Sequence, residues 1–120
     1  MGTEAVKYDS GKPRMDLIPP EVMLALGAVL AYGAKKYSGR NWERGFDWGR
    51  SVAALKRHLT AWEAGQDNDL ETGMSHLWHV LTNAAFLVTF EAREVGTDDR
   101  PTGCALNLWD APKIVEQANG

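Results

Sequence analysis

Two segments with helical periodicity, joined by a short polar turn, constrain the fold of this chain most. In the first segment, apolar residues recur at intervals of four, three, four and three, at Trp48, Val52, Leu55, Leu59 and Trp62. In the second, the main apolar seam runs through Leu70, Met74, Leu77, Leu81, Ala85 and Val88. Residues 65–68, Gly-Gln-Asp-Asn, are typical of a turn. We therefore expect helices over about 47–64 and 68–94 that fold back on each other as an antiparallel hairpin.

The rest of the chain adds one helix and two ends without periodicity. Pro19-Pro20-Glu21 predicts a helix start, and apolar residues then recur at helical spacing to about Tyr37. Asp47 is expected to cap the second helix, and Asn68 with Glu71 resembles a capping box for the third. The sequence therefore predicts an all-α helical bundle over 1–96, built around the hairpin, with an extended arm at 1–18 and a tail at 97–120.

The composition excludes several classes of function. With 44% hydrophobic and 24% charged residues, the chain resembles an ordinary globular protein. Its net charge of −3 predicts no binding to nucleic acid. Cys104 is the single cysteine, which excludes a disulfide within the chain and fits a cytoplasmic protein. No apolar run approaches the roughly 20 residues that span a bilayer, so we expect no membrane contact.

All three histidines, His58, His76 and His79, fall within the predicted hairpin. A turn centred near Asp67 places His58 and His76 equally far from it, and does the same for Glu63 and Glu71. His76 and His79 are three residues apart, so both rings project from one side of a helix, together with Thr72 and Asn83. Such a cluster of imidazoles and carboxylates is typical of sites that bind metals or move protons.

Two alternatives remain open for this cluster. The histidines could hydrogen-bond across a helical core or a subunit interface, since no charged residue lies between Thr72 and Thr89 and buried polar groups need partners. The glutamates Glu63 and Glu71 could share Mg²⁺ or Mn²⁺, or only cap helix ends. Glu71 is about 100° from the His76–His79 stripe, so these residues need not share one ion.

Basic residues supply candidate phosphate contacts. Lys12 and Arg14 lie in the arm, and Arg57 precedes His58. We interpret Arg44 and Arg50 as solvated surface charge. No His-Asp dipeptide and no phosphate-cradling P-loop occurs.

A series of short motifs resembles a known family. The motifs are YDSGKPRMDLIPP (8–20), YGAKKY (32–37), RNW (40–42), RHL (57–59) with Trp62, and ETGMSHLWH (71–79) ending in Asn83. They resemble the phage-associated dATP/dGTP diphosphohydrolase domain family, over about 7–90. The resemblance implies a relation to the all-α, MazG-like pyrophosphohydrolases, which use Mg²⁺ held by carboxylates of two antiparallel helices, usually within oligomers. This chain has fewer carboxylates and more imidazoles there, which favours Mn²⁺ or a transition metal.

The residue pattern and the resemblance together predict a metal-dependent enzyme that hydrolyses nucleoside triphosphates to monophosphate and pyrophosphate, and the resemblance alone implies dATP and dGTP as its substrates. The divalent cation, Mg²⁺ or Mn²⁺, is expected on Glu63, Glu71, His76 and His79. His58 and Glu63 are expected to act in catalysis, with His58 as proton shuttle. The substrate contacts are expected from Lys12, Arg14, Arg57 and Asn83.

The alternative to an enzyme is a non-catalytic helical module that binds nucleotides or assembles with other chains. In either case we expect a homodimer or homotetramer, because a third helix that is apolar on most faces cannot be covered by a chain of this size.

Overall fold

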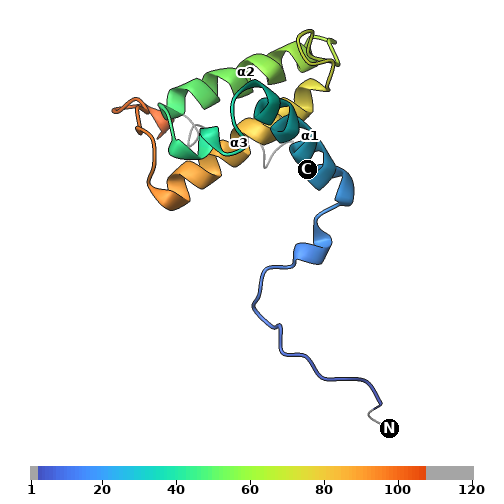
Figure 1. Cartoon of the computed structure of the whole chain (residues 1–120). Coiled ribbons are helices and arrows are strands. Elements are labelled where there is room, and N and C mark those ends of the chain that lie inside the picture. Colours follow the sequence, from blue (N-terminus) through green and yellow to red (C-terminus); the bar gives the residue numbers. More distant parts are fainter. Residues whose placement is uncertain (1–2, 108–120) are drawn as a thin grey trace, which may run out of the picture.

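The computed structural model describes residues 3–107. The elements follow in the order η1 (Met15–Leu17, a 3₁₀ turn), α1 (Pro20–Lys36), η2 (Asn41–Arg44, a 3₁₀ turn), α2 (Trp48–Glu63) and α3 (His76–Arg93). Between residues 3 and 107 there is no β-strand, only two isolated bridges, Asp47 to Thr97 and Asn68 to Ser75. The predicted all-α class is confirmed (Figure 1). None of the helices described is both long and apolar enough to cross a membrane.

The first two helices lie where the periodicity predicted them. Pro20 occupies the first turn of α1 with Glu21 beside it, and Lys35 and Lys36 end the helix, as the helix dipole favours. Asp47 precedes α2 as expected, but its side chain makes no capping bond. Instead Asp99 Oδ1 accepts from Gly49 N at 2.7 Å, so the carboxylate at the positive end of α2 comes from the chain beyond α3.

The third helix begins later than predicted, and the capping box at Asn68 and Glu71 is wrong. Residues 64–75 form a loop, because Asp69 Oδ2 accepts from Thr72 N at 2.9 Å and so holds a local turn. Gly73 has a positive φ of 74°, which ends any helix there. The cap is Ser75, whose Oγ accepts from Leu77 N at 3.2 Å.

The core is small and largely aromatic. α3 packs against α2 along most of its length, and α1 crosses α3 more briefly (Figure 1). Trp42 stacks on Phe86 with ring centroids 4.6 Å apart, and Phe46 meets Phe90 edge-on at 5.0 Å. Of the apolar residues described, only Ala25 and Phe90 are fully buried.

The buried side of α3 is polar in its first half and aromatic near its end, at Phe90. His76, His79 and Thr82 are buried, whereas Leu77 and Val88 of the predicted apolar seam are exposed, Val88 by 66%. The single chain thus leaves apolar side chains of α3 exposed, as expected for a helix that a chain of this size cannot cover. α3 turns its histidines toward α2 and leaves apolar side chains on the outside.

The segment after α3 returns to the start of α2. Trp48 N donates to Thr97 O at 2.9 Å, and Trp48 Nε1 donates to Val95 O at 3.0 Å. Gly45 and Gly96, both with positive φ, cross so closely that a Cβ on either would overlap the backbone of the other segment. The first residues of the predicted tail thus attach to the helical body, and residues 108–120 of that tail lie outside the described part.

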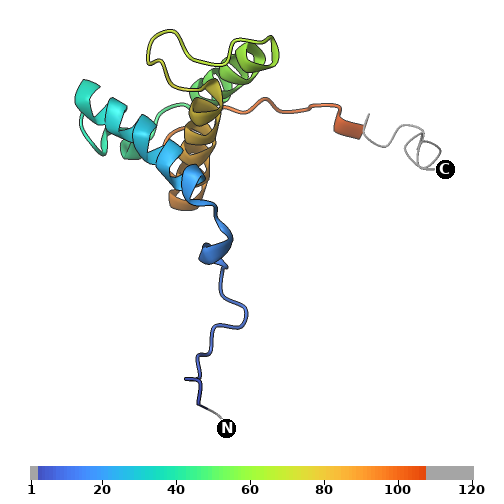
Figure 2. The same cartoon turned by 90° about the vertical axis from the view of Figure 1, so that its right-hand side faces the viewer.

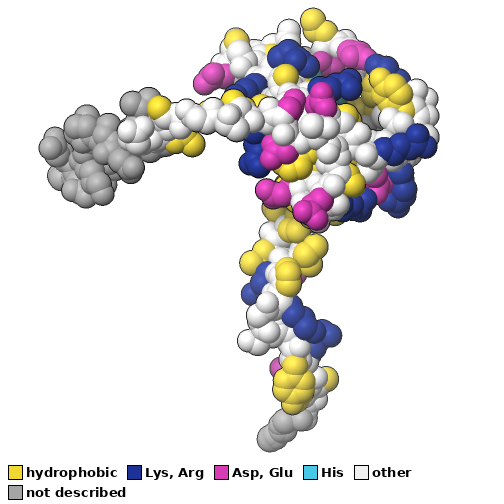
Figure 3. All heavy atoms as spheres, turned by 90° about the vertical axis from the view of Figure 1, so that its left-hand side faces the viewer, with side chains coloured by type: hydrophobic (Ala, Val, Ile, Leu, Met, Phe, Trp, Pro, Cys, Tyr) yellow, Lys and Arg dark blue, Asp and Glu magenta, His cyan; other side chains and the backbone are white. Residues whose placement is uncertain are grey.

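The N-terminal arm extends away from the helices (Figures 1 and 2). Every described residue before α1 is exposed, including Val6, Tyr8, Met15 and Leu17. Figure 3 shows hydrophobic and basic side chains along this arm, well away from the body.

Candidate functional site

A cluster of three imidazoles and one carboxylate lies where α2, the 64–75 loop and the start of α3 meet. His58 Nδ1 lies 2.8 Å from His76 Nδ1, and the ring of His58 stacks on that of His79 with centroids 4.5 Å apart. His58, Asp69 and His76 each direct a ligand atom to one place, with these atoms within 4.8 Å of one another. Two imidazole nitrogens and a carboxylate oxygen at this spacing can hold a divalent transition metal.

Hydrogen bonds fix the tautomers of the His58–His76 pair. His76 Nε2 lies 2.7 Å from Gln66 Oε1, which accepts only, so His76 Nε2 carries a proton and donates it. In the neutral pair, His76 Nδ1 then accepts from His58 Nδ1. A metal-binding histidine ordinarily donates its second N–H to such an oxygen, so Gln66 holds the His76 ring in the tautomer and orientation of a ligand.

His79 plays a different part, because it reaches the carboxylate through a threonine. Thr72 Oγ1 donates to Asp69 Oδ2 at 2.9 Å, so it accepts from His79 Nε2 at 2.8 Å. The direct distance from His79 Nε2 to Asp69 Oδ2 is 3.8 Å. His79 therefore orients Asp69 through Thr72, and its Nε2 is occupied as a donor.

Burial and hydrogen bonding set the charges of the cluster. Burial lowers the pKa of His58, and the nearby His79 lowers it further. Burial likewise lowers the pKa of His79. Burial alone would raise the pKa of Asp69, but the two hydrogen bonds from Thr72 outweigh it and the pKa is lowered. The resting cluster near neutral pH thus contains neutral His58 and His79 beside an ionised Asp69, as a cation site requires.

A cavity of about 470 Å³ opens over this cluster. Its wall includes the polar side chains of His58, Asp69, Glu71, Thr72 and His79 and the aromatic side chains of Trp42, Phe46 and Phe86. The volume lies within the range of small-molecule sites, and the combination of an aromatic wall with a few polar groups is typical of them.

Glu71 belongs to the rim of the cavity and not to the histidine cluster. Lys36 Nζ lies 3.0 Å from Glu71 Oε1, and Tyr32 Oη lies 3.5 Å from the same oxygen. Through Glu71, α1 is joined to the loop that holds Asp69. This pairing holds the pKa of Lys36 above its ordinary value.

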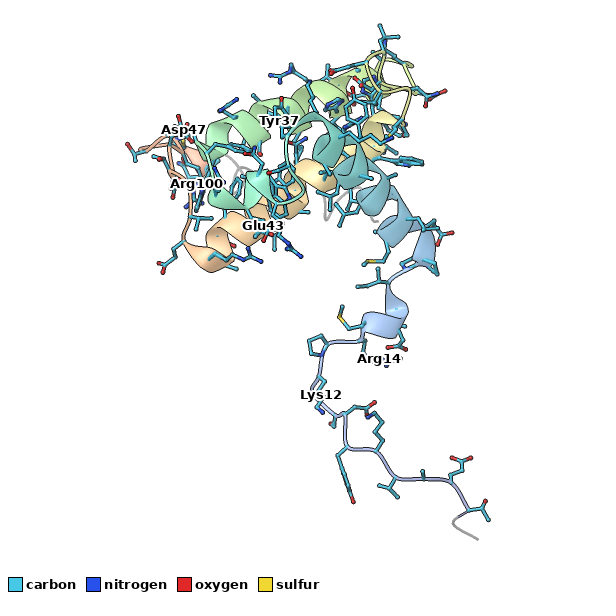
Figure 4. The ribbon with its side chains drawn as sticks, viewed as in Figure 1. Lys12, Arg14, Tyr37, Glu43, Asp47 and Arg100 are labelled. Carbon is cyan, nitrogen blue, oxygen red and sulfur yellow. The ribbon has the colours of Figure 1, made fainter. Side chains whose placement is uncertain are left out.

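The structure brings some predicted site residues together and separates others. His58, His76 and His79 meet, while Glu63, the exposed last residue of α2, lines neither of the cavities described here. Arg57 and Asn83 line a second, adjoining cavity. Lys12 and Arg14 lie on the arm, outside the body formed by the three α-helices (Figure 4), and Arg14 pairs with Asp16 at 2.8 Å.

Sequence reasoning missed Gln66 and assigned the cation to Glu63 and Glu71 in place of Asp69, whereas it placed Thr72 beside the histidines, although on a helix. Asp69 and Thr72 have the Asp-x-x-Thr spacing of a side-chain turn, which was a usable signal. Gln66 carried no signal of its own, because its role depends on where the loop places it.

Comparison with known proteins gives the family to which this chain belongs. Residues 3–100 match the family described as "dATP/dGTP diphosphohydrolase, N-terminal". A dATP/dGTP diphosphohydrolase of Salmonella phage PMBT28 is 34% identical over 112 residues, which are 93% of this chain and 37% of the phage protein. The chain thus spans little more than a third of that relative's length. No solved structure matches. The all-α chain with its histidine-lined cavity belongs to the dATP/dGTP diphosphohydrolase N-terminal family.

Proposed function

We propose that this chain hydrolyses dATP and dGTP to the monophosphate and pyrophosphate with the help of a divalent cation. The observation that carries the proposal is the convergence of His58, Asp69 and His76, two of which, His58 and Asp69, line a cavity that also has aromatic side chains in its wall. Family membership gives the substrate class, since the name of the phage relative specifies dATP and dGTP. The same cavity offers an apolar place for a purine, and its polar side chains lie where the phosphate to be cleaved would meet the cation.

The donor set suits a cation that accepts nitrogen ligands. His58, Asp69 and His76 would hold it, and Gln66 already orients His76 for that role. Two imidazoles and one carboxylate favour Mn²⁺ or a similar transition metal over Mg²⁺. The bound cation would polarise a phosphate oxygen and lower the pKa of a water.

The other residues would bind and orient the substrate. Lys36 stands at the rim, where it can approach a phosphate oxygen while Glu71 holds it. Asn83 Nδ2 donates to His79 O at 2.8 Å, which leaves its Oδ1 and second N–H to meet the base or sugar. Trp42 and Phe86 can cover the face of a purine.

The proposal includes assembly into a homodimer or homotetramer. The outward apolar side chains Leu59, Trp62, Leu77, Trp78 and Val88 support it, because monomers rarely leave so many exposed. Lys12 and Arg14 would then act on a neighbouring chain's cavity, since the arm leads away from its own (Figure 4).

The test is incubation with each of the four deoxynucleoside triphosphates plus Mn²⁺ or Mg²⁺, with the products quantified by chromatography. We expect equal amounts of monophosphate and pyrophosphate, faster turnover of dATP and dGTP, and higher activity with Mn²⁺. Asp69→Asn should lower activity by orders of magnitude. Asp67→Asn is the matched control, since only the backbone oxygen of Asp67 contacts the cluster, at 2.9 Å from His76 N.

Two results would contradict the proposal. Release of orthophosphate in place of pyrophosphate would mean a different reaction. Absence of turnover with either metal, together with nucleotide binding in calorimetry, would favour a non-catalytic nucleotide-binding module.

A further inference from the structure

A second cavity of about 410 Å³ adjoins the first. The two share Phe46, Arg50 and Asn83, so they are neighbours. The second is lined in addition by Ser51, Ala53, Ala54 and Arg57. We call it the arginine groove.

The groove is basic in a chain that is acidic overall. Arg50 and Arg57 lie seven positions apart on α2, about two turns, so their side chains leave the same side of the helix. None of the residues lining the groove is acidic. Arg14, Arg40, Arg93 and Arg100 each pair with a carboxylate, whereas within residues 3–107 neither Arg50 nor Arg57 has one within 4.0 Å.

Arg50 is also held in place. Its guanidinium lies over the Phe46 ring, 5.3 Å from the centroid, and Phe46 belongs to both cavities. A guanidinium fixed in this way can form two parallel hydrogen bonds to a phosphate with little loss of side-chain freedom.

Ser51 adds an independent sign of a ligand. It is 1% exposed, and its Oγ is the buried side-chain polar atom in residues 3–107 that has no hydrogen-bond partner. Buried hydroxyls ordinarily have partners. Ser51 belongs to the wall of the groove, so a rotation about its Cα–Cβ bond would let the hydroxyl donate to an oxygen placed there. Ala53 and Ala54 leave room for that oxygen.

We infer that the arginine groove binds the phosphate groups of the nucleotide, with Arg50 and Arg57 as charged donors and the Ser51 hydroxyl at its base. This inference rests on the proposed function, which it extends by assigning the phosphates to a groove outside the histidine cluster. A triphosphate would then lie along α2, with the phosphate to be cleaved nearest His58.

The test is calorimetric binding of dATP, of inorganic tripolyphosphate and of deoxyadenosine, without metal, to the full chain. Variants are Arg50→Gln, Arg57→Gln and Ser51→Ala, with Lys56→Gln as control because Lys56 is exposed on α2 but lines neither cavity. We expect each arginine variant to bind dATP and tripolyphosphate about tenfold more weakly, since a hydrogen bond to a charged group is lost. Deoxyadenosine binding and the control should match the unchanged chain.

Ser51→Ala separates a ligand contact from a packing role. Removing a buried hydroxyl without a partner should leave the melting temperature equal or higher. We expect that result together with several-fold weaker binding of tripolyphosphate. Unchanged tripolyphosphate affinity in Ser51→Ala would remove the hydroxyl from the site and overturn that part of the inference.

The outcomes distinguish this inference from the proposed function. If the unchanged chain hydrolyses dATP and both arginine variants hydrolyse and bind it equally well, the inference about the arginine groove is overturned but the proposed function is not. Arginine-dependent binding of tripolyphosphate by a chain that hydrolyses no nucleotide would support the groove and contradict the enzyme. Binding of tripolyphosphate but not dATP would also overturn it, because the groove would then serve free phosphates.

Discussion

Thr72→Val tests whether the histidine cluster is held by one hydroxyl. Thr72 Oγ1 donates to Asp69 Oδ2 and accepts from His79 Nε2 and from Met74 N, at 2.9, 2.8 and 3.2 Å. Valine has nearly the same shape and the same β-branch, so the substitution removes hydrogen bonds without a cavity or a change in backbone freedom.

The expected loss in the free energy of unfolding follows from the three hydrogen bonds of the Thr72 hydroxyl. Asp69 loses a charge-assisted bond, which contributes about 1.5–3 kcal/mol, but keeps the one from Thr72 N. His79, only 8% exposed, is left with a donor that has no partner, which costs about 1–3 kcal/mol. His79 Nε2 can recover part of this by closing the 3.8 Å gap to Asp69 Oδ2. We expect a net loss of roughly 2–3 kcal/mol in the free energy of unfolding.

The assay is urea unfolding followed by tryptophan fluorescence and circular dichroism, with nucleotide hydrolysis measured on the same samples. Thr72→Ser keeps the hydroxyl and should lose only about 1 kcal/mol, for the missing methyl group. Activity per folded molecule should fall at least tenfold in the valine variant and little in the serine variant. A valine variant as stable as the serine variant would refute the relay through Thr72.

Three further predictions concern pH, the backbone and assembly. Burial lowers the pKa of His58 and His79 below the ordinary 6.5, so on acidification the unfolded chain takes up protons before the folded chain does. The free energy of unfolding should therefore be full above about pH 6.5 and fall below it. Unfolding midpoints at pH 7.5 and 5.5 check this, because both lie above the range in which Asp69 titrates. Gly96→Ala should destabilise the chain by more than about 2 kcal/mol in thermal unfolding, because residue 96 has a φ of 76° and the added Cβ would overlap Phe46 O. Gly27→Ala should stabilise the chain by about 0.5–1 kcal/mol, because Gly27 lies in the middle of α1 with open space around it. Light scattering should give a multiple of the 13.2 kDa chain mass, and a concentration-independent mass equal to one chain would contradict the proposed oligomer.

The helices could be predicted because local rules decide them. Pro20 and the spacing of the apolar residues of α2 reflect preferences between residues a few positions apart, and these were sufficient to place α1 and α2. The start of α3 could not be placed, since Asp69 and Thr72 suit a helix start and a side-chain turn equally well and Gly73 decides between them only through its conformation.

The site could be predicted only in part for a related reason. The meeting of His58 and His76 follows from their equal distances to the turn. Which carboxylate lies beside them depends on the path of the loop, which directs Asp69 inward and lets Glu71 reach Lys36 on α1. Which face of α3 is buried depends on neighbours that the spacing of its apolar residues does not reveal.

The crossing of Gly45 and Gly96 has a mechanical consequence. Phe46, a wall of both cavities, is held between this crossing and Thr97, whose N lies 3.4 Å from Phe46 O. Two residues further on, Asp99 is tied to the first turn of α2. Tension applied to the chain beyond Asp99 would therefore load the bond from Gly49 at the start of α2 first, and the crossing beside Phe46 once that bond had opened. A force of that kind would displace Phe46 and so change the shape of both cavities, which couples the proposed base site to the chain that follows α3.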